Sequence, residues 1–283
     1  MFDRLSRSWS LVKASWSVLQ QDKELLVFPL ISSLAMLAVL ACFALPLLGT
    51  GALDGLSRGH GTSMTTLHYG IAFLFYVVQY FVIFYFNAAL VGAAMIRLEG
   101  GDPTVGDGLR IASSKLGAIL GYALIAATVG LVLRAIQERV GFLGKIVVGL
   151  LGAGWTVATY LVVPILVTRD VGPVEAVKES ATLLKRTWGE NVVGQAGLGV
   201  AFGLIQFAVI LTGVAIIIAA AMTNSLPLIV AAAVILLSAV LLTFLVHGAL
   251  SGIYAAALYR FATDQQSTPG FRADALQLAF KAK

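Results

Sequence analysis

The chain has 283 residues, of which 59% are hydrophobic and 12% are charged, and its net charge is +5. Soluble domains contain about 25% charged residues, so a soluble protein of this composition could not cover its surface with polar groups. The composition therefore excludes an ordinary soluble protein and favours a chain that has lipid as its solvent. With a single cysteine, Cys42, the sequence also excludes an intrachain disulfide and a cysteine-based metal site.

Six stretches without a single Asp, Glu, Lys or Arg follow one another along the chain. They are residues 25–48, 69–96, 116–133, 146–168, 192–222 and 226–259. About 20 apolar residues in a helix span the hydrocarbon core of a bilayer. The sequence therefore predicts an all-α, polytopic membrane protein with six transmembrane helices, paired as three hairpins.

An amphipathic segment precedes each predicted hairpin, and the three segments share a short pattern. The pattern is an apolar residue, a base, any residue, and then Ser or Ala, and it occurs at 12–15, 109–112 and 177–180. We interpret the chain as one membrane domain, 1–283, with repeat units of about 1–97, 98–169 and 170–260. A pseudo-threefold axis would relate the units, and a C-terminal segment, 261–283, would follow them.

The three leading segments are expected to form helices that lie in the membrane interface on the cytoplasmic side. Apolar residues recur in them at steps of three and four, with bases beside this stripe, which is typical of a helix in the headgroup layer. Three tryptophans, Trp9, Trp16 and Trp188, are predicted interfacial anchors. Two roles stay open for these helices: they brace the hairpins, or they gate a cavity or dock a partner.

The distribution of bases predicts the orientation of the chain in the membrane. Of the 19 Lys and Arg residues, Arg58, Arg134, Arg139 and Lys145 lie in loops on one side, and the remaining 15 lie on the side of the two termini. Cytoplasmic loops carry the excess of bases, so both termini are predicted to be cytoplasmic. This also explains the net positive charge without a nucleic-acid partner.

Four polar side chains lie deep in the predicted spans: Gln79, Asn87, Gln206 and His247. Asn87 precedes Arg97 by about 15 Å of helix rise, and His247 precedes Arg260 by about 20 Å. Asn87 and His247 are therefore expected at similar depths, within reach of a mutual hydrogen bond. Because a polar group in lipid is costly unless it has a partner, we expect all four to face the bundle interior. A purely structural hydrogen bond and a role in a ligand pathway both remain open for His247.

Glycine and proline positions add expectations about the backbone. Gly199 and Gly203 are spaced for close helix contact. Pro164, near the end of the fourth span, predicts a kink. Asp102-Pro103 is expected to open the second leading helix.

The spans lack the residues that membrane enzymes and proton-coupled transporters use. They contain no Asp or Glu for a proton relay or for aspartyl proteolysis. The chain has no P-loop and no dinucleotide fingerprint, and His60 and His68 in a Gly/Thr/Ser loop form a poor metal-binding pattern. We expect no catalysis, no cofactor and no metal site.

Several segments resemble a group of uncharacterised bacterial six-span membrane proteins. The resemblance is carried by Val163-Pro164-Ile165-Leu166-Val167, by the run from Gly172 to Ser180, by Thr187-Trp188-Gly189-Glu190 and by the segment from Ser8 to Pro29. This group is distantly similar to the membrane domain that accompanies glycerophosphodiester phosphodiesterases. The resemblance implies a six-span fold in the bacterial cytoplasmic (inner) membrane, and it supplies no functional residues.

The first functional interpretation is a non-enzymatic membrane protein that binds or passes a lipid-like or apolar molecule. One alternative is a scaffold or assembly factor that recruits partners through its amphipathic helices, and a second is a channel with an uncharged lining. Membrane lipids are the expected partners, together with a second copy of the chain or another protein.

Overall fold

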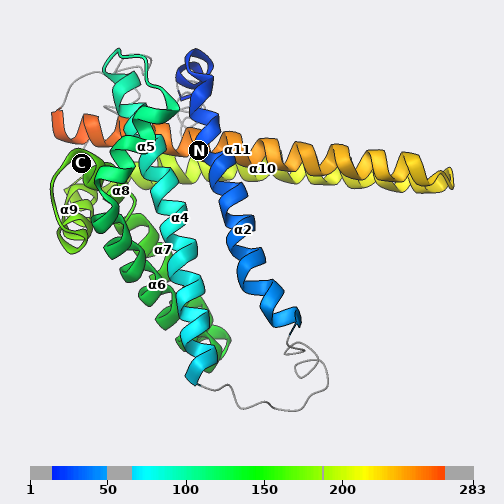
Figure 1. Cartoon of the computed structure of the whole chain (residues 1–283), viewed down its shortest axis with the longest axis horizontal. Coiled ribbons are helices and arrows are strands. Elements are labelled where there is room, and N and C mark those ends of the chain that lie inside the picture. Colours follow the sequence, from blue (N-terminus) through cyan, green and yellow to red (C-terminus); the bar gives the residue numbers. More distant parts are fainter. Residues whose placement is uncertain (1–14, 50–65, 187, 265–283) are drawn as a thin grey trace. The chain divides into compact units, whose positions relative to one another are not determined.

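A computed structural model describes residues 15–49, 66–186 and 188–264, and every element in these ranges is helical (Figure 1). A helix over 15–21 comes first. The elements that follow are η1 (Lys23–Leu26), α2 (Val27–Gly49), α4 (Thr66–Leu98), α5 (Val105–Ser114), α6 (Leu116–Arg139), α7 (Phe142–Ala158), α8 (Val162–Thr168), α9 (Pro173–Arg186), α10 (Trp188–Met222) and α11 (Leu226–Asp264).

In the described part of the chain, six helical segments are long and apolar enough to cross a membrane, as the sequence predicts. They are Lys23–Pro46, Gly70–Leu98, Leu116–Arg139, Phe142–Thr168, Gly197–Met222 and Leu226–Arg260. The all-α, six-span prediction is confirmed. α10 has 35 residues and α11 has 39, so both are longer than the roughly 20 residues that a bilayer core requires.

The chain divides into two compact units. The first unit comprises Met1–Leu26, Ala94–Asp102 and Lys185–Lys283, and the second comprises Val27–Ala93 and Pro103–Leu184. The predicted threefold repeat is a different kind of division, and it stays a prediction.

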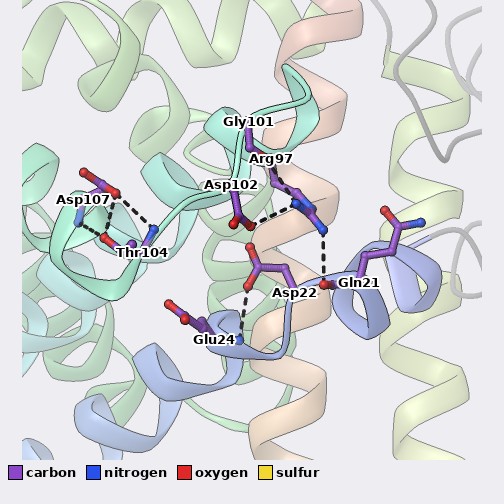
Figure 2. Close-up of polar contacts among 8 residues, drawn as sticks. All are labelled: Gln21, Asp22, Glu24, Arg97, Gly101, Asp102, Thr104 and Asp107. Carbon is purple, nitrogen blue, oxygen red and sulfur yellow. Dashed lines mark hydrogen bonds and ion pairs between the residues drawn. The ribbon is translucent and has the colours of Figure 1, made fainter.

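In the second unit, α5 packs closely on α4 through glycines. A Cβ atom at Gly92 of α4 would lie 2.9 Å from Ile111 Cγ2, and one at Gly108 of α5 would lie 2.5 Å from the Ala89 carbonyl oxygen. Thr104, rather than the predicted Asp102-Pro103, caps α5. Its hydroxyl accepts a hydrogen bond from Asp107 N–H, and the Asp107 carboxylate accepts one from Thr104 N–H, which forms a capping box (Figure 2).

The fourth span is interrupted where the sequence predicts only a kink. α7 ends at Ala158 and α8 begins at Val162. Pro164 accounts for the interruption, because proline has no N–H for the carbonyl four residues earlier and its ring crowds the preceding turn. The Val162 N–H turns to the Thr159 carbonyl oxygen at 3.1 Å, so the Ala158 carbonyl loses its usual helical partner.

A serine of α9 satisfies the backbone groups that this interruption releases. Ser180 Oγ donates a hydrogen bond to the Ala158 carbonyl oxygen at 2.7 Å and accepts one from Leu161 N–H at 3.1 Å. Ser180 is fully buried. Its hydrogen bond with the Leu161 N–H is buried, and the one with the Ala158 carbonyl is partly buried. We call Ser180, Ala158 and Leu161 the serine junction; it fastens α9 to the interrupted span.

In the first unit, α10 and α11 lie side by side as a long antiparallel hairpin (Figure 1). η1 also contacts α11. Gly213 allows the close approach of the two long helices, because a Cβ atom there would lie 2.3 Å from Leu236 Cδ1. The prediction for Gly199 and Gly203 is wrong for contacts inside the described chain: a Cβ at either position would meet no atom within 4 Å. The register of the hairpin places Gly213, and not these two glycines, at the narrow point.

The last position of the shared pattern, which is Ser or Ala, is buried in all three leading segments. Ser15, Ala112 and Ser180 each have 0% exposure. Trp16, a predicted anchor, and Val174, an apolar residue of the third leading segment, are 42% and 55% exposed. The small residue of the pattern therefore lies against protein, while larger apolar residues beside it stay uncovered. This shared burial supports the repeat and the bracing role of the leading helices, both of which stay predictions.

Candidate functional site

Two of the four predicted polar residues, Gln206 and His247, lie on facing sides of the α10–α11 hairpin. Thr243 Oγ1 of α11 donates a hydrogen bond to Gln206 Oε1 of α10 at 2.6 Å. About one helical turn along both helices, the rings of Phe202 and His247 lie 4.9 Å apart between centroids. These four residues form what we call the polar ladder. The sequence identified Gln206 and His247 but gave no sign of Thr243 or Phe202 as their partners.

One end of the Gln206 amide has no partner among the described residues. Gln206 Nε2 is buried and makes no hydrogen bond with any residue that the structure describes. Turning the amide over would let Nε2 donate to Thr243 Oγ1 while the threonine hydroxyl donates to the Ala239 carbonyl oxygen at 3.0 Å. The amide oxygen would then be the unpartnered end. In either orientation the hairpin holds an amide group with an unused hydrogen-bonding position.

The other two predicted residues, Gln79 and Asn87, lie on α4 in the second unit. Gln79 Oε1 is buried and has no hydrogen-bond partner in the described part of the chain. Asn87 is half-buried. The expected hydrogen bond between Asn87 and His247 would join the two units, and it stays a prediction.

The sequence did not predict a charged cluster at the end of α4. Arg97 served there only to indicate the orientation of the chain and the depth of Asn87. The Arg97 guanidinium donates to the carbonyl oxygens of Gln21 at 3.1 Å and Gly101 at 3.2 Å, and to Asp102 Oδ1 at 3.3 Å (Figure 2). We call these residues, together with Asp22, the arginine junction. It ties the residues before η1 to the turn after α4 within the first unit.

Asp22 is the buried acid of the arginine junction, with 6% exposure. Its Oδ1 atom accepts a hydrogen bond from Glu24 N–H at 3.2 Å, and its Oδ2 atom is buried without a hydrogen-bond partner in the described residues. Burial raises the pKa of the Asp22 carboxyl above its usual value, and the nearby Arg97 guanidinium opposes this shift without cancelling it. The neutral acid is therefore favoured more than in water.

Of the three predicted tryptophan anchors, the structure describes two positions. Trp16 is 42% exposed on the helix over 15–21. Trp188 is the first residue of α10 rather than the end of the third leading helix. Trp9 lies outside the described residues.

The described residues contain no group of three or more His, Cys, Asp or Glu side chains that could hold a metal ion. The expectations of no catalysis and no cofactor stay untested.

Comparison with known proteins places the chain in a family. Residues 66–271, which run from the start of α4 to beyond the end of α11, match a family that is described as a family of unknown function (DUF6159). No curated protein matches the chain. The predicted similarity to the membrane domain of glycerophosphodiester phosphodiesterases and the bacterial origin stay predictions. Because the match covers most of the chain, the protein belongs to the DUF6159 family of unknown function, and its described residues include six helices that are long and apolar enough to span a membrane.

Proposed function

We propose that this protein binds a lipid-like molecule, without catalysis, on its α10–α11 hairpin. The observation that carries the proposal is the unpartnered end of the Gln206 amide inside an uncharged, apolar hairpin. An amide without a partner is costly in lipid, so a ligand that completes its hydrogen bonding is stabilised there. The ester carbonyl or hydroxyl group of a lipid has the required chemistry in both amide orientations.

The surface around the polar ladder suits the acyl part of such a ligand. Large apolar side chains on both helices are mostly exposed: Leu204 63%, Phe207 65%, Leu211 60%, Leu242 59% and Phe244 61%. No charged residue occurs between Gly197 and Tyr259. Gln206 is only half-buried, so rotation of its flexible side chain carries the amide from the helix interface to this surface.

Lipid analysis of the purified protein tests the proposal. We expect one lipid class to be enriched over its share of the bulk membrane, and the enrichment to fall in Gln206→Leu, which keeps the side-chain size and removes the amide. Thr212→Val is the matched control, because Thr212 is an exposed polar residue on the same helix outside the polar ladder. The proposal fails if no lipid is enriched, or if both variants retain the same enrichment.

Experiments on the same protein distinguish lipid binding from the two alternative functions, a scaffold and a channel. A protein that is cross-linked to the chain in native membranes, in the absence of lipid enrichment, would favour the scaffold. Water-accessible labelling of cysteines placed at Asn87, Gln206 and His247 would favour the channel.

A further inference from the structure

The second unit carries a basic turn at the end of α6 that the proposed function does not use. Lys115 at the start of α6 pairs with Asp170 at 3.2 Å, and the next charged residue along the helix is Arg134. About 28 Å of helix rise separates Lys115 from Arg134, which is close to the thickness of a bilayer core, about 30 Å. Arg134 and the turn that follows therefore belong to the membrane interface opposite Lys115.

Three bases lie at or next to the tight turn between α6 and α7. α6 ends at Arg139 and α7 begins at Phe142. A Cβ atom at Gly144 would lie 2.5 Å from Val140 Cβ, so the chain turns back closely. Arg134, Arg139 and Lys145 are all exposed at this end.

The bases of the turn are not balanced by acids in the described chain. Arg134 Nε lies 3.1 Å from Glu138 Oε1, and a second hydrogen bond joins Arg134 to the Tyr76 hydroxyl of α4 at 2.5 Å. Glu138 is the one acid between Arg134 and Lys145. Arg139 and Lys145 form no ion pair with any described residue. Within the described residues, two positive charges of the turn, those of Arg139 and Lys145, therefore have no acidic partner.

Apolar side chains stand directly beside these charges. Phe142 and Leu143 are each 78% exposed, and Ile146 and Val147, on the next turn of α7, are 48% and 56% exposed. The turn thus offers cations and an apolar surface within a few residues. An anionic phospholipid has the complementary arrangement, with a phosphate next to acyl chains.

We propose that the α6–α7 turn, through Arg139 and Lys145, binds the headgroup of an anionic phospholipid whose acyl chains lie along Phe142 and Leu143. Charge complementarity selects this lipid over a zwitterionic one, because each base near an anionic lipid surface adds to the attraction. The exposed apolar residues select a lipid over a free phosphate ion. This site lies in the second unit and does not depend on lipid binding by the α10–α11 hairpin.

Tryptophan fluorescence at the turn tests the proposal. Phe142→Trp, at an exposed position, places a reporter there, and the signal of the unchanged chain is subtracted as background. The protein is placed in phosphatidylcholine bilayers that contain brominated acyl chains, which quench tryptophan, on either phosphatidylglycerol or phosphatidylcholine. We expect stronger quenching by brominated phosphatidylglycerol, and a preference that declines as salt screens the charges.

Neutralising the two bases gives the decisive comparison. Adding Arg139→Gln and Lys145→Gln to the reporter is expected to lower the relative association of phosphatidylglycerol roughly thirtyfold. Lys178→Gln is the matched control, since it removes an exposed base from α9 and should leave the preference unchanged. Equal quenching by the two lipids, or a preference that survives the double substitution, would overturn the proposal. If the double variant folds poorly, the salt titration of the reporter variant alone still tests the proposal. A preference for phosphatidylglycerol that does not change with salt would overturn the proposal.

Discussion

The serine junction and the arginine junction fasten helical segments by opposite means. Ser180 in the second unit uses one neutral hydroxyl, fully buried, to satisfy two backbone groups of an interrupted span. Arg97 in the first unit uses a charged side chain, 23% exposed, to reach two carbonyl groups and an acid. Neutral hydrogen bonds between buried groups do not respond to salt or pH, whereas charged groups near water do. The two junctions should therefore differ in strength and in their response to conditions.

The largest expected effect is the loss of the serine junction. Ser180→Ala leaves the buried Leu161 N–H and the partly buried Ala158 carbonyl without their partner, and Pro164 prevents the span from closing into a regular helix. We expect a loss of about 3 kcal/mol in the free energy of unfolding, measured by denaturant titration in detergent. Thr182→Ala on the exposed face of α9 is the control, because among the described residues the Thr182 hydroxyl bonds only to the Lys178 carbonyl one turn earlier. Equal losses in the two variants would show that the serine junction contributes nothing specific.

The arginine junction should contribute less, because it is partly exposed. Arg97→Met keeps most of the side-chain length and removes the hydrogen bonds to Gln21, Gly101 and Asp102. The expected loss is about 2 kcal/mol, and it includes the cost of leaving Asp22 buried without its neighbouring positive charge. Asp102→Asn should change stability little, since Asp102 is 97% exposed. The same titration measures both variants, and a loss for Arg97→Met as large as that for Ser180→Ala would contradict the proposed order.

Asp22 in the arginine junction and Asp107 in the capping box of α5 should make stability depend on pH in opposite directions. Burial raises the pKa of Asp22 above 3.8, so the folded state binds this proton more readily than the unfolded state. The resulting contribution to stability is fully present below that value and is lost as the pH rises through the folded pKa. In Asp107 the hydrogen bonds from Thr104 lower the pKa, so its contribution is present above 3.8 and is lost as the pH falls.

Stability measured against pH separates these two cases. As the pH rises from about 3 to 7, the wild type should lose stability relative to Asp22→Asn and gain it relative to Asp107→Asn. Asparagine keeps an acceptor for Glu24 N–H, so the substitution at residue 22 isolates the effect of charge. If the stability differences for both variants change in the same direction with pH, burial is not the dominant influence on the pKa of Asp22.

Hydrophobicity along the chain was sufficient to place the six spans, because each apolar stretch records directly which residues can face lipid. The predicted end of the third stretch, residue 133, shows where this information stops: α6 continues through Arg134 to Arg139, since a helix can extend beyond the hydrocarbon core. Hydropathy marks the apolar part of a helix and not its full length.

Contacts between distant residues were beyond the sequence reasoning. Pro164 predicted a kink in the fourth span, but the hydrogen bonds of Ser180 with the released backbone groups depend on how α9 packs. The shared pattern did not predict them either, because Ala112 occupies the same position in the second segment and has no hydroxyl. Gln206 and His247 were recognised as polar residues at depth, but the partner Thr243 follows from the register of the α10–α11 hairpin. The close approach of Gly213 to Leu236 shows this register. The spacing of apolar residues along the sequence does not predict that contact.

The smallest expected effect is the response of the two junctions to salt. Raising the salt concentration from about 0.1 M to 1 M shortens the screening length from about 10 Å to about 3 Å. In the Arg97–Asp102 pair, at 3.3 Å, the acid is 97% exposed, so the attraction within this pair is open to screening by salt. The loss caused by Arg97→Met should therefore shrink by a few tenths of a kcal/mol at high salt. The loss caused by Ser180→Ala should stay constant, because no charge takes part in that junction. Measuring both losses at the two salt concentrations removes the general effect of salt on the fold. An equal change in the two losses would mean that charge does not distinguish the junctions.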